Sequence, residues 1–293
     1  MSTPSNPALR MSGADIPTLI GAWVSAARDF HDFVKTLDAD QWLTMSPCPG
    51  WTVADLTAHI VGIERDFVGD ELPPHEPDWA GLTHVRDDDF SRWTEGPVDQ
   101  RRSHEQADVI AELADVIERR IVQLADMAAE PESMVDGPRG KPVTLERALR
   151  MRTFDTWVHE QDARTALDQP GHLDSPGAHL TADFLVASLP FVLGKAMGAT
   201  TGTTLHIVVE GAIPFERMVR IGEDGRASFV EVQSAPLDDL GESWARISTD
   251  WPTFVALATG RVDASSPIIA SAVSIDGDHG LAHRYLAHAN VTP

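Results

Sequence analysis

Residues 144–167, TLERALRMRTFDTWVHEQDARTAL, have apolar and small side chains at the i, i+3, i+4, i+7 spacing of an amphipathic helix. Asp155 and His159 lie four residues apart in this stretch, so their side chains point within roughly 40° of each other. Together, a carboxylate and an imidazole can hold one ion. A buried carboxylate is costly without a metal ion, an arginine or several hydrogen bonds. The pattern is therefore typical either of a metal site or of an Asp155 paired with His159 or Arg152.

A second predicted helix carries another histidine in its apolar face. In residues 47–67, PCPGWTVADLTAHIVGIERDF, Thr52 followed by Asp55 forms a capping-box-like helix start. The apolar stripe that follows includes His59 beside Leu56, Ile60, Ile63 and Phe67. A single histidine on such a face is most often a hydrogen-bonded core residue. Two helices that each carry a metal-capable side chain in their packing stripe favour a metal site instead.

Three segments carry a resemblance to a known family. CPGWTVADLTAHIVG, DTWVHEQDAR and the C-terminal STDWPTFVALATGRVDASSPIIASAVSIDGDHGLAHRYL resemble the mycothiol-dependent maleylpyruvate isomerase family, a branch of the DinB-like metal-binding four-helix bundles. The likeness covers nearly the whole chain after about residue 14. It implies a divalent metal, usually zinc, held by His59, Asp155 and His159. The best-described members have Glu at the position of Asp155, and the shorter acid must draw its helix closer to the ion, bind through water or leave the metal.

The resemblance also implies a mechanism. Three protein ligands leave one coordination position open for water or for the sulfur of mycothiol, the low-molecular-weight thiol of actinobacteria, and the cation deprotonates a coordinated thiol. In the isomerase, the thiolate adds to the double bond of maleylpyruvate, the resulting single bond rotates, and elimination gives fumarylpyruvate. Such a substrate has two carboxylates, for which Arg261 and Arg152 are the candidate catalytic arginines. Arg261 follows Gly260, which is also typical of a simple helix C-cap.

Two further functional interpretations remain open. Asp162 is a candidate acceptor that orients a ligand imidazole, although an exposed helix face explains it equally well. Besides a thiol-using isomerase or S-transferase acting on a small anionic substrate, the chain fits a non-catalytic, two-domain protein that binds a small apolar ligand and has a structural metal or none. A fourth protein ligand, from His75 or His84, would favour the structural ion.

Composition limits the classes of function. The 293 residues are 42% hydrophobic, enough for a proper core and two domains. The net charge of −22, from 23 basic and 45 acidic residues, disfavours nucleic-acid binding. The N-terminus lacks the apolar core of a signal peptide, and no run reaches the ~18 apolar residues of a membrane span, which predicts a soluble cytoplasmic protein with no membrane partner. The single cysteine, Cys48, excludes an internal disulfide and is better interpreted as a small buried loop residue than as a nucleophile.

The order of patterns predicts an α+β chain with two domains. Residues 1–13 are expected to be disordered, 14–170 to form a DinB-like four-helix bundle, and 171–293 to form a smaller, sterol-carrier-like α+β domain. Residues 71–100 are expected to form a long loop with short helical pieces. The predicted bundle helices begin near residues 14, 53, 104 and 144. In the second domain, helices are predicted at 178–197, 251–259 and 280–289, and strands at 204–210, 217–221, 227–232 and 245–248.

Overall fold

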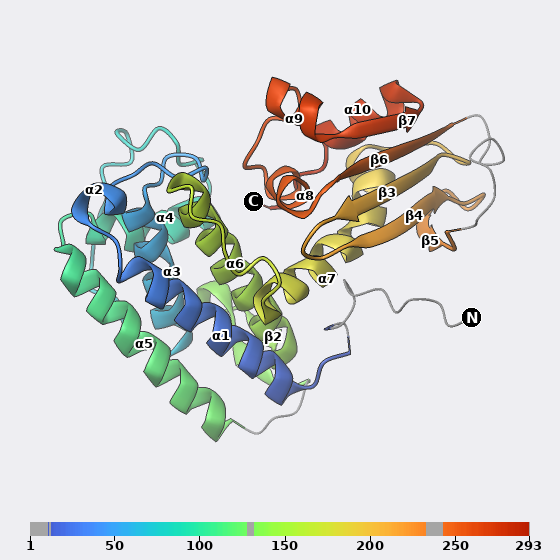
Figure 1. Ribbon diagram of the computed structural model, residues 1–293. Helices are drawn as coiled ribbons and strands as arrows, with labels where there is room; N and C mark the ends of the chain where they lie inside the picture. The colour runs from blue at the N-terminus through green and yellow to red at the C-terminus, as the bar shows by residue number, and fades with distance from the viewer. Residues whose placement is uncertain (1–10, 12, 128–131, 233–242, 293) are drawn as a thin grey trace. The chain divides into compact units, whose positions relative to one another are not determined.

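The structure is a computed structural model that describes residue 11 and residues 13–127, 132–232 and 243–292. The predicted disordered tail, residues 1–13, lies outside the described residues except for Met11 and Gly13. Contacts between Cα atoms divide the described chain into two compact units, Gly13–Gly177 and a second unit that begins at Ala178. Helices and a mixed sheet together confirm the predicted α+β fold class (Figure 1).

Four long helices form the first unit, as predicted. They are α1 (Ile16–Val34), α3 (Val53–Phe67), α5 (Gln106–Asp126) and α6 (Leu145–Ala166). α1 packs against α5 and α6, and α3 packs against the same two helices (Figure 1). The buried apolar residues of these four helices form the core of the unit. A short helix, α2 (Ala39–Trp42), and a hairpin of β1 (Met134–Asp136) and β2 (Pro142–Thr144) fill two of the connections.

Side-chain caps fix where the two ligand-bearing helices begin. The capping box of α3 is confirmed, because the Thr52 hydroxyl accepts from the Asp55 amide at 3.2 Å and the Asp55 carboxylate accepts from the Thr52 amide at 2.9 Å. The α6 helix begins after Thr144, whose hydroxyl accepts from the Arg147 amide at 3.2 Å. These caps set the register in which His59 and Asp155 point into the bundle.

The prediction of a loop across residues 71–100 is wrong in its second half. Residues 89–101 form a thirteen-residue helix, α4 (Asp89–Arg101), which packs on α3. Asp88 caps this helix by accepting hydrogen bonds from the amides of Phe90 and Ser91. The acidic run at residues 87–89 was a helix start, and the mostly polar sequence of α4 with Pro97 inside it concealed the helical period.

Gly62 provides a test of the packing between α3 and α4. A Cβ atom at Gly62 would lie 2.3 Å from Cβ of Pro97, so we expect Gly62→Ala to destabilise the fold by about 1–3 kcal/mol despite the better helix propensity of alanine. Gly21 of α1 has no atom within 4 Å of such a Cβ. The matched variant Gly21→Ala should therefore stabilise the protein by up to about 1 kcal/mol. Urea denaturation measures both, and equal effects would contradict the close approach of α4.

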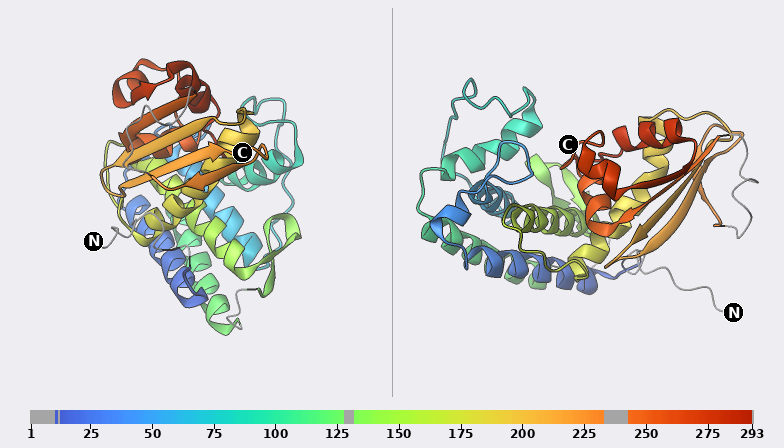
Figure 2. Two further views of the ribbon diagram at one scale, coloured as in Figure 1. Left: turned by 90° about the vertical axis from the view of Figure 1, so that its right-hand side faces the viewer. Right: turned by 45° about the horizontal axis from the view of Figure 1, so that its top comes forward.

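The second unit is built on a five-stranded sheet in the order β5-β4-β3-β6-β7. Figure 2 shows the sheet in orange to red. Its strands are β3 (Thr204–Glu210), β4 (Phe215–Ile221), β5 (Ala227–Val230), β6 (Trp244–Asp250) and β7 (Ser274–Gly277). β3 and β6 are parallel, and the other neighbours are antiparallel. The four predicted strands are confirmed to within three residues, whereas β7 and the short helix α9 (Pro267–Ala272) were not predicted.

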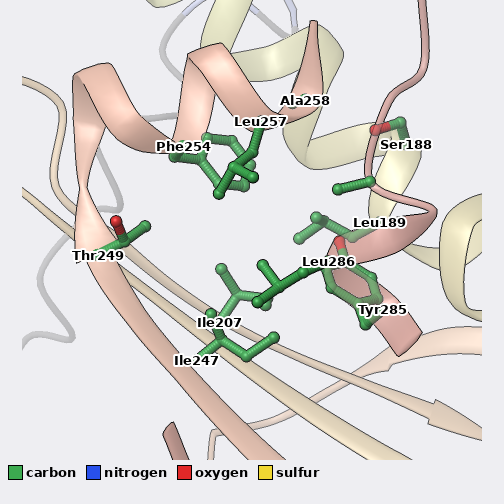
Figure 3. A pocket seen from close by; sticks show the side chains of 11 residues that line it. Ser188, Leu189, Ile207, Ile247, Thr249, Phe254, Leu257, Ala258, Tyr285 and Leu286 are labelled. Carbon is green, nitrogen blue, oxygen red and sulfur yellow. The ribbon is translucent and has the colours of Figure 1, made fainter. Parts of the chain in front are cut away.

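Helices cover this sheet and enclose a small apolar cavity. They are α7 (Pro176–Phe191) with a π-helical turn over Val192–Ala196, α8 (Trp251–Ala258) and α10 (His279–Ala287). The cavity has a volume of about 20 Å³, room for about one water molecule. Its walls come from α7, β3, β6, α8 and α10 (Figure 3). As described, this cavity is too small for the apolar ligand of the non-catalytic alternative.

The two units divide later than residue 170, for a local reason. The segment after α6 stays with the bundle because its backbone carbonyls accept hydrogen bonds from α6. The Trp157 indole donates to the His172 carbonyl at 3.1 Å, and the Gln161 amide donates to the Gly171 carbonyl at 3.3 Å. The Pro and Gly residues near position 170 end α6, but the contacts hold the chain to the first unit through Gly177.

One apolar helix is long enough to cross a membrane by length and composition alone. In the described part of the chain, Pro176–Ala196 has a window with mean hydropathy 1.3, of which 67% is buried in the protein. Core helices have the same length and composition, so this is weak evidence for a span. The absence of a membrane span stays a prediction.

Candidate metal centre

Three predicted ligands converge in the bundle core. His59 extends from α3, and Asp155 and His159 extend from successive turns of α6; one ligand atom of each lies within 4.8 Å of the other two. Nε2 of His59 is 3.2 Å from Oδ2 of Asp155, and Nε2 of His159 is 3.6 Å from Oδ1. Ligands about 2.0–2.1 Å from a tetrahedral zinc ion lie about 3.4 Å from one another. The separations, and the nitrogen and oxygen donors, therefore fit a zinc-sized cation.

Asp155 also pairs with an arginine, which was the other interpretation of the sequence. Nη1 of Arg152 donates to Oδ2 of Asp155 at 2.7 Å, and Nε donates to Oε1 of Glu64 at 2.7 Å. Arg152 is 5% exposed and Glu64 is fully buried, whereas 30% of the Asp155 side chain is exposed. Arg152 thus bridges the buried carboxylate of Glu64 and the candidate ligand Asp155. Asp155 is therefore both the partner of an arginine and a member of the ligand group.

Neighbouring groups hold both imidazoles in place. Nδ1 of His159 lies 3.0 Å from Oδ2 of Asp162, which leaves Nε2 facing Asp155. Asp162 is 3% exposed, so the exposed-face interpretation is wrong and the predicted orienting geometry is present. The Trp51 ring lies 4.9 Å from that of His59 and 5.8 Å from that of His159. The indole N–H of Trp51 donates to Glu95 at 2.8 Å.

The surroundings give the ligands the protonation states that coordination requires. Burial lowers the pKa of His59 from its ordinary 6.5, and Asp155 opposes this only in part. Burial alone would raise the pKa of Asp155, but Arg152, His59 and His159 together hold it well below 3.8. Near neutral pH the site therefore offers an ionised carboxylate and a neutral His59 imidazole, both ready to donate a lone pair to a cation.

Comparison with known proteins identifies the bundle. Residues 23–164 match the family model described as the mycothiol maleylpyruvate isomerase N-terminal domain. By this match, residues 23–164 form a mycothiol maleylpyruvate isomerase N-terminal domain. No curated protein matches the sequence.

Solved structures share the fold of this chain over both units. Two of them are crystal structures of the mycothiol-dependent maleylpyruvate isomerase, one of a mutant with a histidine replaced by alanine. Each has a TM-score of 0.53 and 14% sequence identity to this chain. Each alignment covers 94% of this chain and 96% of the other chain. At this identity the likeness establishes the fold, while the chemistry has to be argued from the residues.

Three other predicted site residues, His75, His84 and Arg261, do not belong to this ligand group. Among the described residues, His75 and His84 do not join the ligand group: His75 pairs with Asp99 at 2.8 Å and His84 with Glu95 at 3.2 Å. Arg261 belongs to the second unit, where it follows the C-terminus of α8. Its amide donates to the Ala256 carbonyl at 2.8 Å, and Gly260 has a φ of +68°, which together form the predicted glycine C-cap.

Sequence reasoning missed Glu64, Glu95 and Trp51 as neighbours of the site. Arg152 interrupts the apolar stripe of α6, and a buried guanidinium requires a buried acid, but this did not indicate which acid it would be. The only sign of Glu95 was its place in the region predicted as a loop. Trp51 follows the Pro-Gly turn before α3, and nothing in its spacing showed that it would lie against two imidazoles.

Proposed function

We propose that this protein is a metal-dependent enzyme that uses mycothiol either to isomerise a small anionic substrate or to transfer a thiol to it. The observation that supports it most directly is the convergence of His59, Asp155 and His159 with no fourth ligand from the described protein. A site with three protein ligands is typical of catalytic zinc, whereas structural zinc has four. When bound, the cation would deprotonate a coordinated thiol, and the thiolate supplies reversible addition to an activated double bond.

The protein's own contribution is to fix the donors. Asp162 accepts from Nδ1 of His159 and so keeps Nε2 free of a proton, as a ligand nitrogen requires. Arg152 holds Oδ2 of Asp155 at 2.7 Å, which stops the shorter acid from turning to solvent. We propose that Arg152 positions the ligand, while its predicted contact with substrate stays a prediction.

Mycothiol dependence separates this proposal from the non-catalytic alternative. We expect purified protein to contain about one divalent ion per chain, and to isomerise maleylpyruvate only when mycothiol is added. Elemental analysis and an absorbance assay with and without mycothiol measure both. Stoichiometric metal without any thiol-dependent reaction on maleylpyruvate or on an S-transfer substrate would favour a structural ion.

Metal retention should depend on pH with a definite sign. Protonated imidazole cannot coordinate, so the ion is lost once the pH falls through the pKa of His59. Because burial lowers the pKa of His59 below 6.5, we expect the ion to be retained at pH 7 and released only below pH 6.5. Metal content after dialysis across this range measures the release. Loss of the ion already above pH 7 would contradict the protonation states proposed for the site.

Arg261 is proposed as the arginine that binds a substrate carboxylate. Nη1 of Arg261 donates to the Thr259 carbonyl at 2.9 Å, and the side chain is partly exposed. We expect Arg261→Gln to raise KM for a dicarboxylate by about tenfold or more, through loss of a charge-assisted hydrogen bond of about 1.5–3 kcal/mol. Metal content should not change. Arg284→Gln, in α10, is the matched control. An unchanged KM in Arg261→Gln would show that Arg261 has only a structural role at the end of α8 and does not bind the substrate.

A further inference from the structure

A second set of potential ligands shares His159 with the first. The sulfur of Cys48, a ring nitrogen of His159 and a carboxylate oxygen of Asp162 all lie within 4.8 Å of one another. Asp162 approaches Nδ1 of His159 at 3.0 Å, whereas Asp155 is 3.6 Å from Nε2. The acids of the two sets therefore face opposite nitrogens of one imidazole. His59 and Asp155 do not belong to the set that includes Cys48.

The turn before α3 holds Cys48 at this position. The Ser46 hydroxyl accepts from the Cys48 amide at 3.1 Å and donates to the Trp51 carbonyl at 2.8 Å. The Trp51 amide donates to the Cys48 carbonyl at 3.2 Å, and Gly50 takes the φ of +80° that the turn requires. Cys48 is partly exposed, while His159 and Asp162 are buried on α6. The three donors thus come from two fixed elements, and of the three residues Cys48 is the one that is partly exposed.

We propose that Cys48, His159 and Asp162 form a second cation site, one for a soft divalent ion such as cadmium, that competes with the first site for His159. Thiolate and imidazole donors favour soft and borderline ions over magnesium or calcium. On binding, the Cys48 thiol releases its proton to solvent and the sulfur coordinates the ion. The proposal that a cation occupies this set stands on its own geometry, whereas the competition rests on the proposed function of His159 as a ligand in the first set.

The competition follows from the proton count of one imidazole. A neutral ring carries a single N–H. With an ion on Nε2, that proton is on Nδ1 and is donated to Asp162; with an ion on Nδ1, it is on Nε2 and faces Asp155. Two ions at once would require the ring to lose its last proton. One chain therefore holds an ion at either set, and a soft ion at the second set displaces the thiol-activating ion from the first.

Cadmium titration tests the second site directly. Because Cys48 is the only cysteine in the chain, a sulfur-to-cadmium charge-transfer band in the ultraviolet reports this site alone. We expect the band in the wild-type protein and its absence in Cys48→Ser. Asp162→Asn and His159→Ala should weaken the cadmium affinity measured from the band by about tenfold or more. His59→Ala, which removes a ligand of the first set only, should leave that affinity unchanged or higher.

Each outcome has a distinct meaning. No band in the wild-type protein, or an unchanged affinity in both His159→Ala and Asp162→Asn, would overturn the second site. Two cadmium ions bound per chain, with the band present, would overturn the competition. Zinc binding in Cys48→Ser tests the first site separately: retention of zinc there supports the proposed function even if the cadmium band is absent from the wild-type protein. Loss of zinc in Cys48→Ser would show that the two sets are not separate sites.

Discussion

His159→Ala should remove the metal ion and lower the mycothiol-dependent rate by about 1,000-fold or more. The variant deletes one of three proposed ligands, and the activating ion is expected to contribute several kcal/mol of transition-state stabilisation, with each 1.36 kcal/mol worth about tenfold in rate. His159 is also shared by both ligand sets, so no alternative arrangement of the described donors keeps three ligands. Elemental analysis and single-substrate kinetics at saturating mycothiol measure the two effects.

A surface histidine of the same unit provides the control. His31 on α1 pairs with Asp32 at 3.1 Å and is absent from both ligand sets. His31→Ala should keep its metal and its rate. If His159→Ala retained a stoichiometric ion and a normal rate, neither ligand set would explain metal binding, and the alternative with a structural or absent metal would gain support. Melting curves of both variants would separate loss of the ion from loss of the fold.

The long helices could be predicted because their apolar faces dominate their sequences. Trp23, Leu113 and Leu149 recur at helical spacing and are each at most 1% exposed in the bundle core. α4 has no such face: only Glu95, Val98 and Arg101 are buried, and two of them are charged. Its position is determined by contacts with α3 and by the Asp88 cap, and pairwise contacts of this kind leave no period in the sequence.

The ligands could be predicted, but the charges that support them could not. His59, Asp155 and His159 stand out because metal-capable groups interrupt apolar stripes at i, i+4 spacing. Glu64 lies five residues after His59, next to Arg65 and Asp66, where it is easily taken for a solvated charge. Only the packing of α3 against α6 brings Glu64 within 2.7 Å of Arg152, 88 positions later in the chain. Sequence spacing within one helix contains no information about that pairing.

Glu64→Ala should destabilise the protein by about 3–5 kcal/mol. It would leave the guanidinium of Arg152 buried with one of its two carboxylates missing, and removal of one partner of a buried ion pair typically costs this much. Arg120, also buried, has Nε 4.0 Å from the other oxygen of Glu64, so a second cation loses its compensation. Urea denaturation in the presence of a chelator measures the loss of stability without a contribution from metal binding.

A double variant distinguishes an uncompensated charge from simple loss of packing. If the cost of Glu64→Ala comes from the stranded guanidinium of Arg152, then Glu64→Leu combined with Arg152→Met should recover part of the stability, because well-packed apolar residues replace a buried ion pair at little cost while Arg120 still lacks its carboxylate partner. The same double variant should bind metal more weakly, since Asp155 loses the hydrogen bond at 2.7 Å that holds its Oδ2. Partly restored stability with weakened metal binding is the result expected if Arg152 positions Asp155. Equal metal affinity in the wild-type and double-variant proteins would instead show that the Glu64–Arg152 pair is part of the bundle core but does not position Asp155.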